Sequence, residues 1–227
     1  MRYCSGLKAS GLTRRHLMFA CQRTAMNHWT PPTDPLRQEI AMTAARLIAE
    51  FGYDYATAKQ KAVKSLLGTR RVDRDLLPSN AEIEDEVREY QALFQADTQP
   101  QRLAHMRRIC LDFMQKIDVF SPLVYGALVN GTAGDHSGIH LLAFADDPKE
   151  TDYFLLNAGL NFEPVQVGAV NGQEVDAVQF AWRGEDFSLA TLLPVRRRGL
   201  LRPDADGKLL RLDRAGLQNL IDESEDD

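Results

Sequence analysis

Hydrophobic residues recur at helical spacing through the first half of the chain, and the stripes carry start and stop signals. Asp34 precedes Pro35, which is typical of a helix N-terminus, and Gly52 follows the last apolar position of the first stripe. Ser79 and Glu82 form a capping-box pattern ahead of a later stripe. The spacing predicts four helices, at 35–51, 55–67, 80–94 and 99–117.

The period changes after Pro122, where short apolar runs bounded by Gly and Asp replace the helical stripes. The pair Asn171-Gly172 between two extended runs is the strongest short-range signal for a β-hairpin, because both turn residues need a positive φ. The runs predict strands at 123–130, 138–145, 163–170, 173–182 and 187–193. Two short helices are expected among them, at 148–158 and 213–221.

These elements predict an α+β fold, in which an N-terminal helical bundle precedes a small mixed β-sheet domain. The residues before Asp34 lack hydrophobic periodicity and are rich in Gly, Ser, Thr and Arg, so we expect a disordered leader. Five of the last six residues are acidic. The predicted organisation is a leader at 1–33, a helical region at 34–120, a sheet domain at 121–221 and an acidic tail at 222–227.

Charge narrows the classes of partner. The formal net charge is −5, and the first 35 residues hold five basic residues against one acid, so the remainder is more acidic than the whole. Clustered Lys and Arg are needed to attract phosphate backbones, which argues against a specific nucleic-acid partner. The run Arg196-Arg197-Arg198 is the exception, and two interpretations stay open: a solvated turn or a phosphate clamp.

Hydropathy and cysteine usage predict a cytoplasmic protein without a membrane partner. The apolar runs are all shorter than the roughly 18 to 20 residues that a membrane-spanning helix needs. Cys4, Cys21 and Cys110 are odd in number and far apart, so they predict neither a zinc site nor a disulfide framework. Reduced thiols in the cytoplasm are the simplest interpretation.

The segment 128–142 carries the pattern most suggestive of chemistry. A predicted strand leads to Gly131-Thr132, and after a short loop Ser137 and Gly138 open the next strand, which carries His140. Glycine beside a small hydroxyl residue lets a backbone approach a phosphate closely. The strand that follows places Gly138 and His140 on one face, because residues i and i+2 of a strand point the same way.

This layout resembles the core of the polymerase-β-type nucleotidyltransferase superfamily. In that family a hydrophobic residue and Gly-Ser are followed, after a spacer, by carboxylate-hydrophobic-carboxylate on the next strand. A third carboxylate comes from a later strand. Together the three acids hold two Mg²⁺ ions, which orient the nucleotide and stabilise the charge that develops during transfer.

The resemblance implies a degenerate active site. Gly131 and Thr132 take the place of Gly-Ser, and Gly138 and His140 stand where two carboxylates belong. Asp176 matches the third carboxylate and is the implied catalytic and metal-binding residue. Glycine offers no ligand, and imidazole suits Mg²⁺ poorly because that ion prefers hard oxygen donors. The implied nucleotide site consists of Gly131, Thr132, Ser137 and His140.

We therefore expect a catalytically degenerate nucleotidyltransferase-like protein, which binds a nucleotide or a protein partner and has a regulatory role. Two alternatives stay open. One is an active enzyme that uses Mg²⁺ with a nucleotide and combines Asp176 with Asp135 in an atypical site; the other is a protein-interaction module without a ligand. His136 and His140 beside Asp135 also leave a transition-metal site open, although ordinary polar residues of a loop and a strand explain them more simply.

Overall fold

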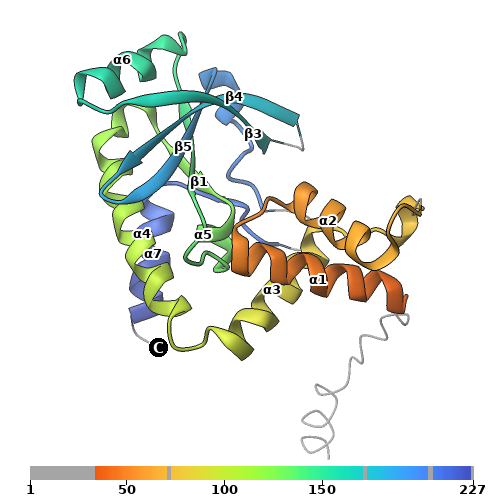
Figure 1. Ribbon diagram of the computed structural model, residues 1–227. Helices are drawn as coiled ribbons and strands as arrows, with labels where there is room; N and C mark the ends of the chain where they lie inside the picture. The colour runs from red at the N-terminus through yellow and green to blue at the C-terminus, as the bar shows by residue number, and fades with distance from the viewer. Residues whose placement is uncertain (1–33, 71–72, 171–172, 204–206, 226–227) are drawn as a thin grey trace, which may run out of the picture. The chain divides into compact units, whose positions relative to one another are not determined.

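Helices occupy the first half of the described chain and strands most of the second half, so the predicted α+β class is confirmed (Figure 1). The computed structural model describes residues 34–70, 73–170, 173–203 and 207–225. The predicted leader and the predicted Asn171-Gly172 turn lie outside these residues. No helix in the described ranges is long and apolar enough to cross a membrane.

The three N-terminal helices are α1 (Pro35–Phe51), α2 (Tyr55–Leu67) and α3 (Asn80–Phe94), as the sequence predicts. The Asp34 carboxylate accepts the N–H of Leu36 at 2.9 Å, and Gly52 ends α1 with a left-handed φ of 67°. Ser79 and Glu82 form the predicted capping box at the start of α3. The helices share a core built largely on alanines, which allow close approach: Ile40, Ala41, Ala44, Ala45, Ala58, Ala62, Ile83 and Val87.

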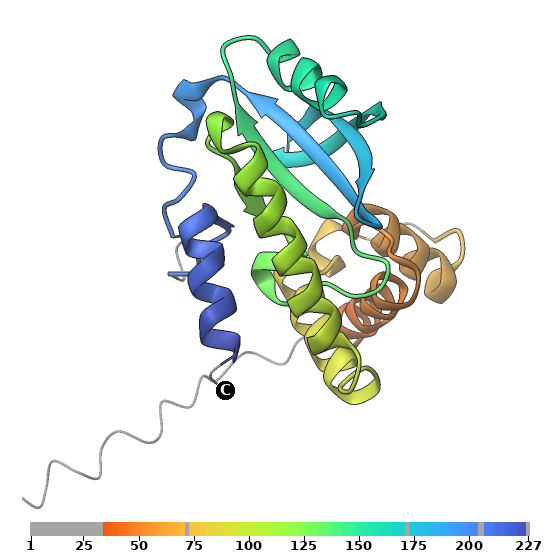
Figure 2. The same cartoon turned by 90° about the vertical axis from the view of Figure 1, so that its left-hand side faces the viewer.

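The fourth predicted helix, α4 (Gln99–Lys116), packs on the sheet rather than in the core of α1–α3. Its Phe113 ring lies 5.2 Å from the rings of Phe180 and Trp182 and 4.9 Å from that of Phe187, measured between centroids. Helix α7 (Arg214–Glu225) lies beside α4 (Figure 2). Because α7 continues to Glu225, the first part of the predicted acidic tail is helical.

The sheet is mixed, as predicted, with the strand order β3-β4-β5-β2-β1-β6. Strand β2 pairs in parallel with β5, and the other pairs between neighbours are antiparallel. The strands are β1 (Leu123–Tyr125), β2 (Ile139–Phe144), β3 (Phe162–Val170), β4 (Gln173–Trp182), β5 (Glu185–Leu192) and β6 (Arg211–Leu212). The pairing of β3 with β4 and of β1 with β2 confirms the neighbours that the sequence predicts, whereas β6 is an addition.

The two faces of the sheet are covered differently. The α4 face carries Ile139 and Leu141 of β2, which belong to the core that includes α4 and α7. The opposite face carries Leu142 and Phe144, which pack in a smaller core beside Leu200. Helix α6 (Lys149–Asn157) follows β2 and begins one residue later than predicted; the Asp147 carboxylate, just ahead of it, accepts the N–H of Lys149 at 2.9 Å.

Candidate functional site

The predicted strand at 123–130 is wrong beyond its third residue. Strand β1 ends at Tyr125, Gly126 turns the chain with φ 79° and ψ −144°, and the short helix α5 (Ala127–Asn130) follows. A short apolar run fits a strand and a buried helical turn equally well, and periodicity does not separate them. The glycine that directly follows the first strand is therefore Gly126, and Gly131 ends a helical turn instead, with φ 83°.

Gly131 and Thr132 use their backbone to join elements. The side-chain amide of Gln99 donates to the carbonyl oxygens of Gly131 and Ala133, both at 2.9 Å. The side-chain amide of Gln91, on α3, donates to the Thr132 carbonyl at 2.9 Å. Thr132 itself is buried. These contacts fix the loop after α5 against α3 and α4, which is a structural role for both residues.

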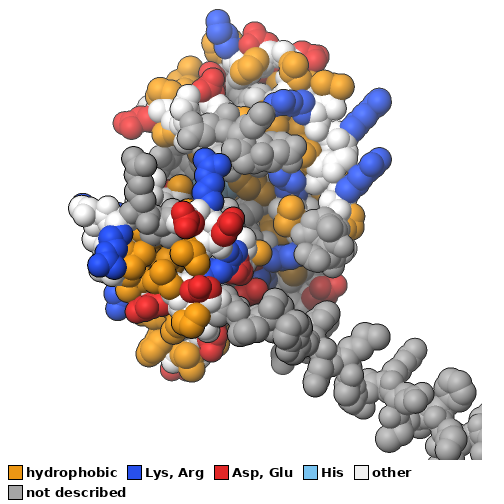
Figure 3. Space-filling model, turned by 90° about the vertical axis from the view of Figure 1, so that its right-hand side faces the viewer, with side chains coloured by type: hydrophobic (Ala, Val, Ile, Leu, Met, Phe, Trp, Pro, Cys, Tyr) orange, Lys and Arg blue, Asp and Glu red, His pale blue; other side chains and the backbone are white. Residues whose placement is uncertain are grey.

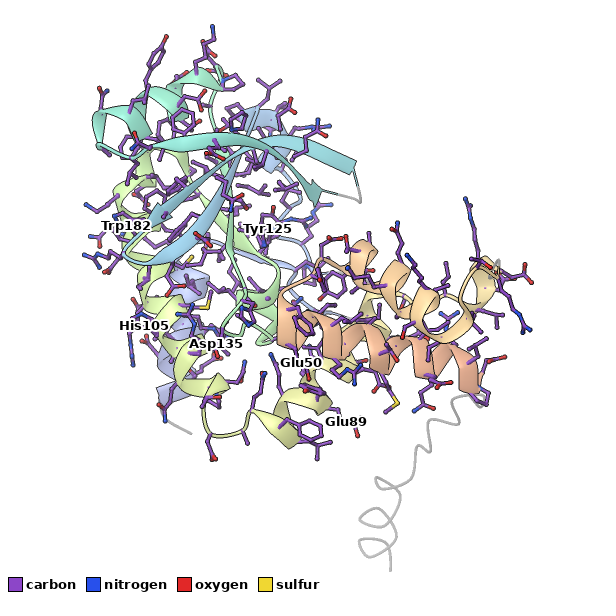
Figure 4. All side chains as sticks on the ribbon, in the orientation of Figure 1. Glu50, Glu89, His105, Tyr125, Asp135 and Trp182 are labelled. Atoms are coloured by element: carbon purple, nitrogen blue, oxygen red, sulfur yellow. The ribbon has the colours of Figure 1, made fainter. Side chains whose placement is uncertain are left out.

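Ser137 closes the loop that leads into β2. Its hydroxyl oxygen accepts the N–H of Gly134 at 2.9 Å, and its own N–H donates to the Gly134 carbonyl at 3.1 Å. Asp135, inside this loop, is mostly exposed, and its carboxylate lies 3.6 Å from Nε of Arg102 (Figure 4). Ser137 therefore stabilises the loop itself, and Asp135 connects the loop to α4.

His140 lies on the face of the sheet opposite α4, next to β5. Its Nδ1 is 2.6 Å from the Ser188 hydroxyl oxygen, and its ring centroid is 5.5 Å from that of Tyr125. Burial lowers the pKa of His140 below its ordinary value, because the charged imidazolium loses hydration. The imidazole is therefore neutral and engaged with Ser188 at neutral pH.

Two glycines border the His140 ring. A Cβ placed on Gly126 would lie 3.6 Å from Cδ2 of His140, and one placed on Gly138 would lie 3.8 Å from Cε1. The nearest atom to the Gly138 position is the Asp186 carbonyl oxygen at 3.5 Å, which is ordinary van der Waals contact. The absence of side chains at these glycines therefore leaves the edge of the ring uncovered by either residue.

Asp176 lies apart from His140. It is exposed on β4, where its carboxylate is 3.4 Å from the side-chain amide of Gln166. In the register of the sheet His140 is opposite Ser188 on β5, and Ser188 is opposite Gln179 on β4. Asp176 is an odd number of residues from Gln179, so its side chain points to the α4 face. The structure does not bring Asp176 and His140 together.

Strand pairing instead gives His140 two neighbours that the sequence pattern does not indicate, Ser188 and Tyr125. The Tyr125 hydroxyl is buried without a hydrogen-bond partner among the described residues, and burial raises the pKa of Tyr125 to about 12. Figure 4 shows Tyr125 on the sheet, on the side away from α4. The alternation of polar and apolar residues around Ser188 predicts that this residue lies on a strand. It does not indicate which other strand pairs with it.

A second polar cluster links α3 to the end of α5. The buried Glu84 carboxylate accepts hydrogen bonds from Arg88 at 2.5 Å, from the Asn130 amide at 2.8 Å and from Lys208 at 2.8 Å. Three donors around one carboxylate offset the cost of removing its charge from water. This cluster ties the helical region and the C-terminal segment to the same turn.

Metal chemistry finds no support in the described residues. They contain no group of three or more His, Cys, Asp or Glu side chains placed to hold an ion. The alternative that joins Asp176 with Asp135 requires two acids that belong to separate places, a β4 position on the α4 face and an exposed loop. The alternative of a transition-metal site at His136 and His140 lacks a third ligand of these types within the described ranges.

Comparisons with known proteins do not assign a family or a function to the chain. Comparison with protein-family models, with curated proteins and with solved structures finds no match to the chain.

Proposed function

We propose that the sheet domain is a nucleotidyltransferase-like module that binds a nucleotide without metal and transfers nothing. The observation that carries the proposal is the chemistry of one strip of the sheet. His140 on β2 and Ser188 on β5 share a face, and Gly138 directly precedes β2; in the resemblance, a two-metal enzyme of this kind would present its three carboxylates along this strip. Here the three positions hold no acid.

The same strip supports binding by neutral groups. Gly126 and Gly138 have no side chains, so neither residue covers the edge of the His140 ring that it borders. Neutral imidazole and hydroxyl groups can bond to a base or a ribose without a cation. The resemblance matches Gly131 and Thr132 to the family's Gly-Ser; in the structure the glycine that directly follows β1 is Gly126, and Ala127, which comes next, has no hydroxyl.

Isothermal titration calorimetry with ATP, GTP, CTP and UTP tests the proposal, first with EDTA and then with Mg²⁺. We expect saturable binding of at least one nucleotide in EDTA, with a Kd within about threefold in Mg²⁺, and no release of pyrophosphate. Binding that requires Mg²⁺, or pyrophosphate release, would support an active enzyme. Absence of binding under both conditions would favour a protein-interaction module.

Two variants locate the site. Gly138→Leu places a side chain beside His140, where a Cβ meets no atom closer than 3.5 Å, and it should weaken binding at least tenfold while the protein stays folded. Asp176→Asn is the matched control, since it removes an exposed charge from the other face. Equal affinities of Gly138→Leu and the parent protein would count against this location.

A further inference from the structure

A surface pocket of about 490 Å³ lies at the far end of β2 from His140, between α4, α7 and two 3₁₀ turns. The turns are η2 (Asp118–Phe120), which leads to β1, and η3 (Pro194–Arg197), which follows β5. Leu123, the first residue of β1, pairs with Leu142 near the end of β2. The pocket is therefore at the carboxyl ends of the parallel pair β2 and β5, the position where open α/β sheets commonly bind ligands.

The charged side chains that line the pocket differ in whether an oppositely charged group or a hydrogen bond offsets their charge. The Asp118 carboxylate lies 3.5 Å from Nε of Arg214, and the Asp213 carboxylate accepts the N–H of Gly216 at 2.9 Å as the cap of α7. Arg197 donates from Nε to the Ser121 carbonyl at 3.4 Å and lies 6.0 Å from the centroid of the Phe144 ring. Within the described residues, no carboxylate forms an ion pair with this guanidinium.

The pocket wall also holds a strained residue. Ser121 has φ 48° and ψ 54°, a left-handed conformation that non-glycine residues rarely adopt. Such conformations persist where the surrounding structure imposes them, and they concentrate at ligand sites. Here the conformation directs the Ser121 carbonyl toward Arg197, which places the guanidinium at the pocket.

We propose that this pocket binds a small molecule bearing an oxyanion, a phosphate or a carboxylate, with Arg197 as the group that contacts the anion. A guanidinium presents several N–H donors in a planar fork that matches either anion. The side chains of Gln115 and Gln218 also line the pocket and can bond to polar groups on the rest of the ligand. The volume falls in the range of small-molecule sites.

This site is separate from the nucleotide strip, since it lies at the other end of β2. It also gives a specific role to one member of the basic run at 196–198. Arg197 lines the pocket, whereas its neighbour Arg196 is exposed and does not. The two arginines therefore form a matched pair for testing, with the same charge and adjacent positions in one turn.

The test is a ¹H–¹⁵N NMR titration of the full chain with inorganic phosphate, with acetate in a second arm and sodium chloride at equal ionic strength as the control. We expect saturable shifts of the Gly216 amide and its neighbours with phosphate or acetate and none with chloride, and the stronger arm identifies the anion. Arg197→Ala should weaken binding at least fivefold, and Arg196→Ala should leave it within twofold.

Three outcomes would overturn the proposal: no saturable shift with either anion, an equal response to chloride, or an equal loss in Arg196→Ala and Arg197→Ala. Arg197→Lys is the control for a loss of binding that is caused by misfolding. It keeps the charge but loses the planar fork, so it should bind with an affinity between those of the parent protein and Arg197→Ala. The melting temperature of each variant is measured alongside.

Discussion

The buried imidazole of His140 should make stability depend on pH in a defined window. Burial lowers its pKa in the folded state below the ordinary value of 6.5, which the unfolded chain retains. As the pH falls through 6.5, the unfolded state takes up a proton that the folded state resists. The stabilisation is therefore complete above about pH 6.5 and is lost as the solution becomes more acidic.

The magnitude follows from the linkage of one proton. Proton uptake by an unfolded-state imidazole with a pKa of 6.5 limits the contribution of His140, so the free energy of unfolding falls by at most about 1.4 kcal/mol between pH 7.5 and pH 5.5 through this residue. Other ionisable groups titrate over the same pH range, so the change in stability of the parent protein must be compared with that of a variant that lacks the His140 imidazole. His140→Gln supplies it, because the amide can still bond to Ser188 but does not titrate.

Urea unfolding at pH 7.5, 6.5 and 5.5 measures both proteins. The parent should lose up to about 1.4 kcal/mol more than His140→Gln over this interval. The other histidines are common to the two proteins and cancel in the difference. Parallel stability profiles would refute the reasoning, because they would mean that His140 titrates alike in the folded and unfolded states.

Two further predictions concern the same strip of the sheet. Gly126→Ala should reduce the free energy of unfolding, measured by urea unfolding, by about 1–3 kcal/mol. The reason is that the Gly126 backbone has φ 79° and ψ −144°, a region that only glycine adopts readily. A loss below about 0.5 kcal/mol would contradict this prediction. The triple variant Gly138→Asp, His140→Asp and Ser188→Asp should gain calorimetrically measurable Mg²⁺ binding that the parent lacks, and the gain should persist when Asp176→Asn is added. Dependence of that gain on Asp176 would contradict the strand register.

Local signals predicted the helices well, because their ends are encoded by neighbouring residues. The Asp34 cap, the Gly52 stop and the capping box of Ser79 and Glu82 each act within one turn of the chain. The strand at 123–130 failed for a local reason as well. Three apolar residues and Asn130 follow Gly126 and form a helical turn, whereas the predicted strand continued past this glycine, which separates the two conformations.

The composition of the site depended on information that no local pattern contains. The local pattern correctly predicts that His140 lies on a strand. Its neighbour Ser188, however, is 48 positions away in sequence and is brought to it by the pairing of β2 with β5. Asp176 was selected because it is an acid on a later strand. Which face it occupies depends on β5 lying between β4 and β2, and the order of strands is set by packing across the whole sheet.

The parallel pair at the centre of the sheet also constrains how the chain folds. The pairs β3–β4 and β4–β5 join segments that are close in sequence, so the entropy lost on closing their loops is small. The contact of β2 with β5 must span α6 and this whole meander, and its larger loop makes it the slower step. We infer that the meander forms first and docks on β2 afterwards, so the strip containing His140 and Ser188 is completed late in folding.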